Sequence, residues 1–221
     1  GNNAAGEKSI KYGATLNYVK GLRVVLSNGE VIETKRLNKR ELSKKMGLSN
    51  FEGEVYRALD ALIEENGDLI DSLNLDVTKN SAGYGIAGVK KSDGSFDLTP
   101  LIVGSQGTLG IVSEITLRTE PHNPKATLMA GFFDDIRDVE DVVHDLRKMS
   151  NPPSAIEIVD RNLINFINES NPNLLKGAFG KNIPKITMLI EFDDSSDRTQ
   201  SKSEKKAKKI LEHRGVDCRV E

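Results

Sequence analysis

The sequence predicts an α+β fold in two parts, on three observations. Short β-branched runs up to about residue 120 are separated by Asn-Gly, by Asp-Gly and by a loop with glycine at every third position. Residues 121–124 hold two prolines and an asparagine, which predicts a linker. Beyond the linker, strand-like runs alternate with segments whose apolar residues recur at helical spacing.

The first part begins with a predicted hairpin. Residues 22–27 and 30–33 flank Asn28-Gly29, and Asn-Gly between two such runs is the strongest short-range hairpin signal. The further predicted elements are a helix at 39–46, a helix at 54–65 that stops at Gly67, an irregular glycine-rich segment at 81–88, and a turn at Asp93-Gly94.

The glycine loop, residues 104–110, carries the most information about function. We expect a strand at Leu101-Ile102-Val103 before it and another at residues 111–117 after it. Rossmann-type dinucleotide loops and phosphate-binding P-loops open into a helix, so the predicted strand after the loop excludes both. Alone, the loop is equally consistent with a hairpin connector and with a cradle where a ligand approaches bare peptide groups.

The second part predicts four strands and three helices. The strands are expected at 126–133, 155–159, 186–192 and 216–220. The helices are expected at 136–149, at 160–168 with Asp160 as cap, and at 202–213 with Gly215 just past the end. With the middle helix as an insertion, the order is βαββαβ, the split βαβ of ferredoxin-like domains.

Composition excludes several classes of function. The formal net charge is -2, so no global basic field points to nucleic acid or to an anionic membrane. No apolar run is long enough to span a bilayer. Cys218 is a lone cysteine at an apolar strand edge, which predicts a passive residue and suits a reducing compartment. No metal site is predicted, because no metal-ligand spacing relates the three histidines, His122, His144 and His213.

Several polar clusters have structural interpretations. Asp134 and Asp135 are predicted to help start the helix that follows them. Asp193, Asp194 and Asp197 lack the EF-hand pattern and predict a polar loop. An RNA-binding role for the second part is disfavoured, because its strands lack aromatic stacking pairs. A solvated face is predicted for the lysines of the last helix, Lys205, Lys206, Lys208 and Lys209.

Two N-terminal motifs are weak signals when each is taken alone. Gly1-Asn2-Asn3-Ala4-Ala5-Gly6 is small and polar, and it predicts a tight turn more readily than a ligand site. Lys11-Tyr12-Gly13 predicts a strand end with an exposed aromatic ring.

In combination, the motifs resemble a known family. The chain runs through Gly-Asn-Asn-Ala-Ala-Gly, Lys-Tyr-Gly, the hairpin, Asn80-Ser81-Ala82-Gly83-Tyr84 and the stretch 97–111. This series resembles the PCMH-type FAD-binding domain of FAD-linked oxidases, the vanillyl-alcohol-oxidase-like superfamily, and most of all its D-lactate dehydrogenase and glycolate oxidase subunit group. Residues 1–121 would be the second FAD-binding subdomain. Residues 125–221 would be the N-terminal part of the cap domain, with Glu157-Ile158-Val159-Asp160 at a strand end of Glu-x-x-Asp type.

The resemblance implies a site for FAD. Two departures from the family are Gln106, where glutamate is frequent, and Asn17, where aspartate is frequent. The pyrophosphate and flavin side would be lined by Asn2, Asn3, Ala4 and Gly6, with Tyr12 and Gly13 in the adjoining wall. The adenosine end would meet main-chain groups of Gly107, Gly110, Ile111 and Val112.

The resemblance also implies an activity. The intact enzyme would oxidise a D-2-hydroxy acid by hydride transfer to the flavin and pass electrons to a quinone, a cytochrome or an iron–sulfur protein. It would be cytoplasmic, with peripheral membrane association of the intact enzyme as an alternative. Two other functions stay open: an FAD-linked oxidase or reductase of another substrate class, and a non-enzymatic binding or scaffold domain.

The residues at both ends of the chain suggest that it is a piece of a longer protein. The chain starts at Gly1 without a methionine and ends directly after the apolar run at 216–220. In the family, the main pyrophosphate loop precedes this region and the substrate-handling residues follow it, so catalytic residues are expected outside the chain. The chain alone is expected to be inactive, to bind FAD weakly or not at all, and to self-associate through exposed apolar surface.

Overall fold

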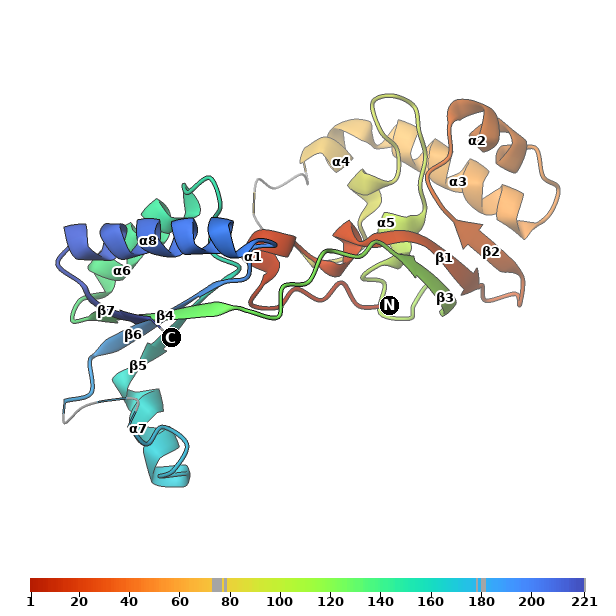
Figure 1. Cartoon of the computed structure of the whole chain (residues 1–221). Helices are drawn as coiled ribbons and strands as arrows, with labels where there is room; N and C mark the ends of the chain where they lie inside the picture. Colours follow the sequence, from red (N-terminus) through yellow and green to blue (C-terminus); the bar gives the residue numbers. More distant parts are fainter. Residues whose placement is uncertain (73–76, 78, 178, 180–181, 221) are drawn as a thin grey trace. The chain divides into compact units, whose positions relative to one another are not determined.

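The chain folds into two compact units in this computed structural model, which describes residues 1–72, 77, 79–177, 179 and 182–220. Unit 1 comprises Gly1–Ala5 and Gly13–Thr119. Unit 2 comprises Gly6–Tyr12 and Glu120–Glu221. Figure 1 labels the elements of both units, and each unit is described by itself.

The sheet of unit 1 has three antiparallel strands in the order β2-β1-β3, namely β2 (Val31–Thr34), β1 (Val19–Val25) and β3 (Ile111–Leu117). The predicted hairpin at Asn28-Gly29 is confirmed between β1 and β2. Two backbone hydrogen bonds close its turn: the Gly29 N–H donates to Leu26 O at 3.0 Å, and the Leu26 N–H donates to Glu30 O at 2.8 Å. Gly29 has a φ of 85°, so the loop is a turn followed by a left-handed residue, a common three-residue hairpin connection.

Helices cover one face of this sheet. Helix α2 (Lys39–Met46) has the bounds that the sequence predicts, because Asn38 and Glu41 form a capping box at its start. Helix α3 (Phe51–Glu65) begins at the cap Asn50 and buries Tyr56. The Tyr56 ring lies 5.8 Å from that of Phe96, in a core that also contains Leu22 and Val24 of β1. The shorter helical segments are η1 (Thr15–Asn17), α4 (Gly67–Ser72), η2 (Ile86–Gly88) and α5 (Thr99–Ile102).

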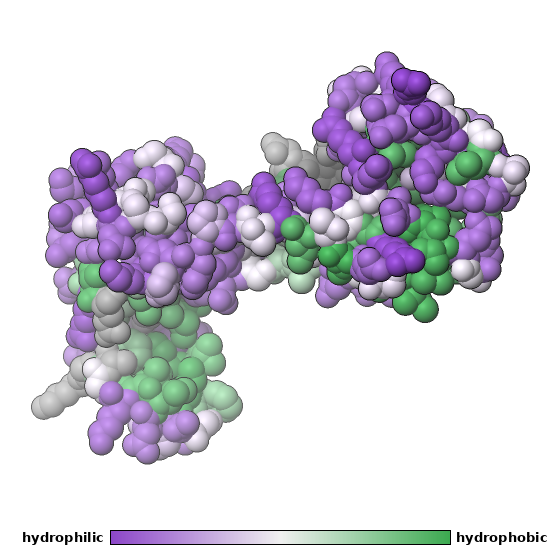
Figure 2. Space-filling model, turned by 45° about the vertical axis from the view of Figure 1, so that its right-hand side comes forward, coloured by the Kyte–Doolittle hydropathy of each residue, from purple (hydrophilic) through white to green (hydrophobic). Residues whose placement is uncertain are grey.

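Large apolar side chains remain exposed on the strands of unit 1. Figure 2 shows apolar atoms gathered on one side of this unit, on the right of the view. Val31 and Ile111 lie opposite Val25 in the sheet register, which places them on the face away from the core. The exposed large apolar residues of the three strands are Val31, Ile111, Ile115 and Leu117. The face away from the core therefore carries Val25, Val31 and Ile111 beside the charged side chains of Arg23, Glu33 and Glu114. Ile115 lies opposite the core residue Leu22 and so belongs to the other face.

Two predictions for unit 1 are wrong. The run Leu101-Ile102-Val103 is not a strand: α5 covers Thr99–Ile102. Its start has a cap-like signal, because the Asp97 carboxylate accepts from the Thr99 N–H at 2.8 Å and Pro100 stands in the first turn. The start predicted for the helix at 54–65 is wrong too: α3 begins at Phe51 after the cap Asn50, although it ends at Glu65 as predicted, and α4 starts just beyond it at Gly67.

Unit 2 has a four-stranded antiparallel sheet in the order β5-β6-β4-β7. Its strands are β4 (Thr127–Phe133), β5 (Ala155–Asp160), β6 (Ile186–Phe192) and β7 (Asp217–Val220). Its longer helices are α6 (Ile136–Arg147), α7 (Arg161–Ser170) and α8 (Asp197–His213). The chain order β4-α6-β5-α7-β6-α8-β7 is a split βαβ arrangement with α7 inserted between β5 and β6.

Helix ends in unit 2 follow local signals. Asp135 caps α6 and Asp160 caps α7, as the sequence predicts, and Gly215 has a φ of 68° just past the end of α8. Helix α8 starts at Asp197, five residues before the predicted 202, because the Ser196 hydroxyl caps it by accepting from the Thr199 N–H at 3.2 Å. The predicted strand end at Tyr12 is instead the last residue of a short helix, α1 (Ser9–Tyr12).

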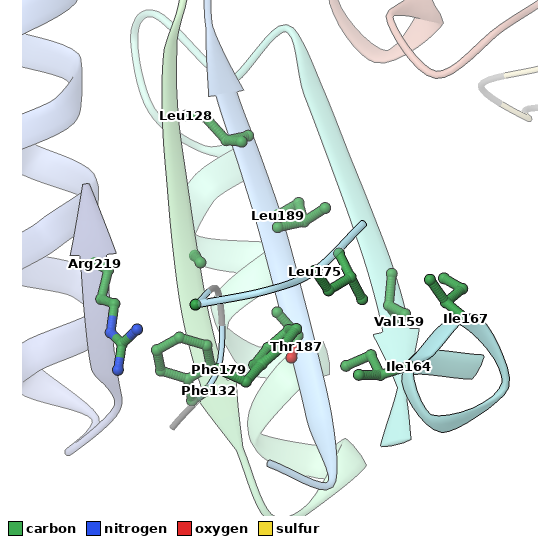
Figure 3. A pocket seen from close by; sticks show the side chains of 12 residues that line it. Leu128, Phe132, Val159, Ile164, Ile167, Leu175, Phe179, Thr187, Leu189 and Arg219 are labelled. Carbon is green, nitrogen blue, oxygen red and sulfur yellow. The ribbon is translucent and has the colours of Figure 1, made fainter. Parts of the chain in front are cut away.

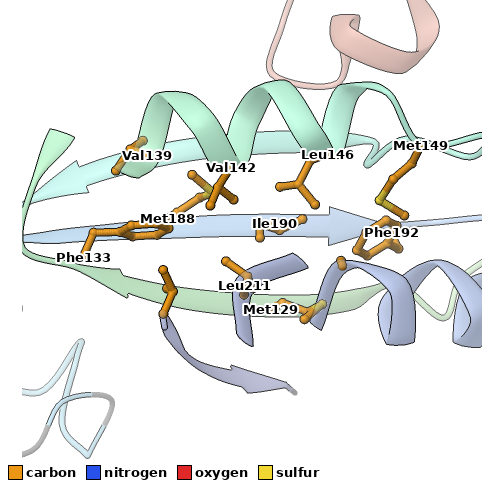
Figure 4. Packing of buried hydrophobic residues seen from close by; sticks show 12 residues of the cluster. Met129, Phe133, Val139, Val142, Leu146, Met149, Met188, Ile190, Phe192 and Leu211 are labelled. Atoms are coloured by element: carbon orange, nitrogen blue, oxygen red, sulfur yellow. The ribbon is translucent and has the colours of Figure 1, made fainter. Parts of the chain in front are cut away.

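The main core of unit 2 lies between the sheet and helices α6 and α8. Figure 4 shows side chains of both helices and of the inner strands β4 and β6 pointing toward one another. Side chains alternate between the two faces of a strand, so every second residue of β4 and β6 enters this core. The core residues from those strands are Met129, Phe133, Met188, Ile190 and Phe192.

Ion pairs attach residues 6–12 to the rest of unit 2. Asp193 follows β6 and accepts hydrogen bonds from Lys11 Nζ at 2.9 Å, Tyr12 Oη at 2.8 Å and Lys8 Nζ at 3.1 Å. Lys8 Nζ also donates to Glu191 Oε1 at 2.6 Å, and Lys11 Nζ to Asp194 Oδ1 at 3.1 Å. We call these six residues the N-terminal clamp. The predicted polar loop at Asp193 and Asp194 therefore has a structural role as the acceptor of this clamp.

The clamp shifts the titration of its members. Burial alone would raise the pKa of Asp193, but hydrogen bonds from Lys11, Tyr12 and Lys8 outweigh burial and lower the pKa below its usual 3.8. Burial alone would lower the pKa of Lys11, but hydrogen bonds to Asp193 and Asp194 outweigh burial and raise the pKa above 10.5. The clamp therefore stabilises the folded unit between these two usual pKa values and weakens beyond either end.

Asp193→Asn is expected to loosen the clamp, because two lysines and a tyrosine lose a charged acceptor. We expect faster amide hydrogen exchange in Ser9–Tyr12 at pH 7, equivalent to a loss of about 1–3 kcal/mol in local stability. After correction for intrinsic rates, wild-type protection should also fall as the pH drops below about 4, where Asp193 binds a proton.

The matched control is Asp197→Asn, which removes an exposed pair with Lys125 at 3.2 Å. This control should leave the exchange of Ser9–Tyr12 unchanged. Equal exchange in Asp193→Asn and wild type would contradict the clamp.

Candidate functional site

The first five residues of the chain lie against the glycine loop in unit 1. The Gln106 N–H donates to Gly1 O at 2.6 Å. A Cβ placed on Gly104 would lie 3.5 Å from the Cβ of Asn3, an ordinary packing distance, so the two residues are neighbours. Two motifs about a hundred residues apart in the sequence, which the resemblance assigns to one FAD site, are thereby brought together.

Asn3 has a structural task in this arrangement. It is buried, with 9 % of its surface exposed, while Asn2 and Ala4 on either side are exposed. Asn3 Oδ1 accepts from the Leu16 N–H at 3.0 Å, and its main-chain oxygen accepts from Ser81 Oγ at 2.9 Å. The side-chain oxygen of Asn3 is thus used to fold the segment, whereas Asn2 and Ala4 face outward.

The glycine loop contains a turn with two left-handed residues. The Thr108 N–H donates to Ser105 O at 3.1 Å, and φ is 52° at Gln106 and 86° at Gly107. Positive φ at both central positions defines a type I′ turn, in which glycine is favoured at the second position. Gln106 is the single non-glycine residue with positive φ among the described residues. The shape of the loop therefore depends on the left-handed conformation of Gln106 and Gly107 as well as on its small side chains.

The glycines of the loop have different environments. A Cβ on Gly107 would meet no atom within 4 Å, so this position opens to free space. A Cβ on Gly110 would lie 2.7 Å from both Val24 Cγ1 and Val25 O. Gly110 is thus required for packing against β1, whereas Gly107 leaves room for another molecule to approach the main chain.

Ile111 and Val112, which are predicted to meet the adenosine end of FAD, are the first two residues of strand β3. Ile111 is 72 % exposed, and Val112 is half-buried opposite Val24. A further polar group stands beside the loop, where Tyr84 Oη and Thr108 Oγ1 are 2.9 Å apart. Tyr84 lies next to Gly83, whose carbonyl oxygen would be 3.8 Å from a Cβ on Gly104. Residues 81–84 therefore form a third segment at the loop.

Three predicted site residues lie at the N-terminal segment beyond Ala5. Gly6 and Tyr12 belong to unit 2 and Gly13 to unit 1. Tyr12 is held in the clamp by its hydroxyl, and Lys11 Nζ lies 5.4 Å from the centre of its ring. Gly13 has a φ of 77° and makes room for Asn17 Oδ1, which accepts from the Ala14 N–H at 2.9 Å. Asn17 therefore acts as a local cap where the family frequently has aspartate.

No group of three or more candidate metal ligands is found among the described residues. Partial burial raises the pKa of Cys218 above its usual 9.0, so the thiol is protonated at neutral pH. In the part of the chain that the structure describes, no helix is long and apolar enough to cross a membrane.

Several groups beside the glycine loop of unit 1 are open to solvent. Asn2, Ala4 and Gly107 are exposed, and the main chain at Gly107 is reachable because no atom occupies the space of a missing Cβ. Exposed peptide groups at a left-handed turn are suited to phosphate and ribose oxygens. The contact of this loop with the adenosine end of FAD stays a prediction.

Comparison with known proteins identifies the family. Residues 122–219 match the family described as "FAD linked oxidases, C-terminal domain". These residues, somewhat less than half of the chain, are similar to that domain of the FAD-linked oxidases. The predicted resemblance to FAD-linked oxidases is confirmed by a match in the second part of the chain, whereas the motifs that suggested it lie in residues 1–121.

Relatives extend the likeness beyond that domain. The chain is 30 % identical over 214 residues to "D-lactate dehydrogenase [cytochrome], mitochondrial" of Arabidopsis thaliana, covering 96 % of this chain and 27 % of that protein. It is 28 % identical over 165 residues to D-2-hydroxyglutarate dehydrogenase of Pseudomonas putida, covering 73 % and 16 %. It is 29 % identical over 159 residues to a glycolate oxidase subunit of Bacillus subtilis, covering 72 % and 23 %. The chain thus spans less than a third of each of these relatives.

A solved structure shares the fold. A structure of alkyldihydroxyacetonephosphate synthase superimposes with a TM-score of 0.57 at 14 % identity, covering 97 % of this chain and 31 % of that one. At this identity the likeness concerns the fold. It agrees with the predicted α+β class.

Sequence reasoning missed two groups of residues. The first is the clamp, whose partners Lys11 and Asp193 are separated by 182 positions. The second is Thr187 and Arg219, which line a cavity in unit 2 (Figure 3). A signal for Thr187 was available, because it is a lone hydroxyl inside the apolar strand 186–192. No local pattern marks Arg219.

Gly110→Ala is expected to destabilise unit 1 more than Gly107→Ala. A methyl group at Gly110 collides with β1, which costs about 1–3 kcal/mol for overpacking and about 1–3 kcal/mol for backbone strain. At Gly107 the methyl group meets free space, so the left-handed conformation alone costs about 1–2 kcal/mol. Urea unfolding followed by circular dichroism measures both values, and equal losses would contradict the packing role of Gly110.

Proposed function

We propose that the protein containing this chain is an FAD-dependent oxidoreductase that acts on the CH–OH group of a 2-hydroxy acid. The family match of residues 122–219 carries this proposal. Three similar proteins named for oxidation of D-lactate, D-2-hydroxyglutarate or glycolate support the substrate class. The meeting of the N-terminal segment with the glycine loop supports the cofactor.

Residues 1–121 are proposed as the second FAD-binding subdomain and residues 125–221 as the start of the cap domain. FAD, when bound, supplies the electron acceptor for oxidation of the alcohol. Gly107 would let the cofactor approach the main chain, with Ile111 and Val112 beside it, and Gly110 would hold the loop against β1. Asn2 and Ala4 of unit 1 would contact the pyrophosphate and flavin side, where Asn3 and Gly13 set the backbone. Gly6 and Tyr12 belong to unit 2, and their contact with FAD stays a prediction from the sequence.

The proposed electron acceptor is a quinone, a cytochrome or an iron–sulfur protein. The word "cytochrome" in the name of the Arabidopsis thaliana relative supports one of these. We propose a cytoplasmic protein. The alternative is peripheral association with a membrane, because electrons passed to a quinone leave the enzyme at a membrane.

The experiment uses the whole gene product that carries this chain. The purified protein is expected to be yellow, with flavin absorbance that bleaches under anaerobic addition of D-lactate, D-2-hydroxyglutarate or glycolate. Colourless protein that also ignores added FAD would refute the flavin proposal. If the protein contains flavin but none of the three acids bleaches it, the proposed substrate class is refuted and the proposed cofactor is not.

Gly107→Val is expected to weaken FAD binding at least about tenfold, because the side chain fills the space where the cofactor would approach the main chain. Gly29→Val is the matched control: Gly29 also has positive φ, at 85°, and no atom lies within 4 Å of its missing Cβ. Both variants carry similar backbone strain. Equal loss of FAD in both would show that strain, and not contact, explains the effect.

A further inference from the structure

Two asparagines of unit 1 are followed by glycine: Asn28-Gly29 in the β1–β2 hairpin and Asn66-Gly67 between α3 and α4. This dipeptide reacts with itself in water. The main-chain nitrogen of the glycine gives its proton to solvent and bonds to Cγ of the asparagine, and ammonia leaves as a cyclic succinimide forms. Water then opens the ring to aspartate or isoaspartate. Glycine favours the attack because it has no Cβ to obstruct it.

Solvent reaches both dipeptides. Asn28, Gly29 and Asn66 are exposed, and Gly67 is half-buried. No atom lies within 4 Å of the missing Cβ of either glycine. Beside the second dipeptide, residues 64–69 line a hollow of about 320 Å³. Exposure therefore does not distinguish the two dipeptides, and the difference between them must come from hydrogen bonding.

Hydrogen bonds hold the attacking nitrogen of the first dipeptide. The Gly29 N–H donates to Leu26 O at 3.0 Å. The carboxamide of Asn28 is held at both ends, because Oδ1 accepts from the Glu30 N–H at 3.0 Å and Nδ2 donates to Glu30 Oε1 at 3.1 Å. Attack on Asn28 therefore requires the hairpin turn to open, since the nitrogen must leave its acceptor and the carboxamide must rotate.

The attacking nitrogen of the second dipeptide lies between two helices. Helix α3 ends at its C-cap Asn66, whose N–H donates to Leu62 O at 3.2 Å. Gly67 is the first residue of α4, and the first N–H groups of a helix have no acceptor within that helix. The Ile70 N–H binds the oxygen of the peptide between Asn66 and Gly67, at 2.9 Å, and leaves its nitrogen available.

The carboxamide of Asn66 is also less restrained than that of Asn28. Among the described residues it makes one hydrogen bond, from Nδ2 to Leu62 O at 2.8 Å. Rotation toward Gly67 breaks that single bond, whereas Asn28 must break two. The folded structure therefore opposes the reaction more strongly at Asn28 than at Asn66.

Acidic side chains stand near both dipeptides. A negative charge disfavours loss of a proton from the glycine nitrogen, so it slows the reaction. Glu65 and Asp68 flank the second dipeptide in the sequence, and Glu64 beside them is paired with Lys90. The carboxylate of Glu30 lies against Asn28 itself. Because both dipeptides have such neighbours, charge does not reverse the difference made by the hydrogen bonds.

We propose that Asn66 is a site of spontaneous deamidation in the folded protein, while the hairpin turn protects Asn28. The modified residue carries one more negative charge and has no Nδ2 donor for Leu62 O. The reaction consumes water, releases ammonia and requires no flavin, so the proposal stands or falls separately from the proposed function.

The test compares two sites in one sample. The 221-residue chain is incubated for weeks in mildly alkaline buffer, and its tryptic peptides are analysed by mass spectrometry for aspartate and isoaspartate at both positions. We expect deamidation at Asn66 to be at least about fivefold faster than at Asn28, which must first free the bonded Gly29 nitrogen. Equal rates, or a faster reaction at Asn28, would overturn the proposal.

Incubation in guanidinium chloride separates the effect of the fold from that of the local sequence. Without the hairpin and the helices, the two Asn-Gly dipeptides are expected to react at rates within about twofold of each other. A fivefold lead of Asn66 that persists in denaturant would show that the folded structure is not its cause, and would overturn the assignment.

Matched variants identify the modified residue. Ion-exchange chromatography of the incubated wild type is expected to show an acidic form. Asn66→Gln should abolish this form, because glutamine would have to close a larger ring, whereas Asn28→Gln should leave it unchanged. An acidic form that persists in Asn66→Gln would overturn the proposal.

Gly67→Ala tests the attacking nitrogen. It should slow deamidation of Asn66 at least about fivefold, since the methyl group obstructs the approach to Cγ. A Cβ at Gly67 meets no atom within 4 Å, so the circular dichroism spectrum should stay that of wild type. An unchanged rate in Gly67→Ala would contradict attack by this nitrogen.

Discussion

The alternation of side chains along antiparallel strands determines which residues of unit 2 fill its core and which line its cavity. Helices α6 and α8 cover one face of the unit 2 sheet, and Met188, Ile190 and Phe192 of β6 fill that face. The residues between them, such as Thr187 and Leu189, necessarily point the other way. A one-residue slip of β6 would exchange the two sets, so the dry core that holds the unit together also fixes the composition of the cavity.

The same constraint operates at the glycine loop. Val24 of β1 faces the core of unit 1, and strand β3 must lie close enough to pair with it. Gly110 permits that approach because it has no Cβ. Three glycines with identical spacing therefore have distinct settings: Gly104 has a φ of 95° beside Asn3, Gly107 is the second central residue of the turn and faces free space, and Gly110 lets β1 pack. Backbone conformation explains glycine at positions 104 and 107, and packing explains it at 110.

Local signals in the sequence predict most elements and few of the contacts. The residue patterns at 39–46 and 186–192 predict helix α2 and strand β6 with their observed bounds. The strand predicted at Leu101 is wrong because apolar periodicity over three residues cannot outweigh Pro100 in a helical first turn. The clamp is invisible to such reasoning, because an aspartate after β6 gives no indication that a lysine 182 positions earlier will meet it. The cavity follows from register and from the placement of α7, neither of which a local pattern contains.

The N-terminal motif illustrates how folding narrows the choice of ligand contacts. As a sequence, Gly-Asn-Asn-Ala-Ala-Gly followed by Lys-Tyr-Gly offers several polar groups to a cofactor. In the structure, Asn3 Oδ1 accepts from Leu16, and Tyr12 Oη donates to Asp193. The positions of this motif that stay exposed are Asn2, Ala4 and Gly6. The two most distinctive side chains of the motif serve to hold the segment in place, one in each unit.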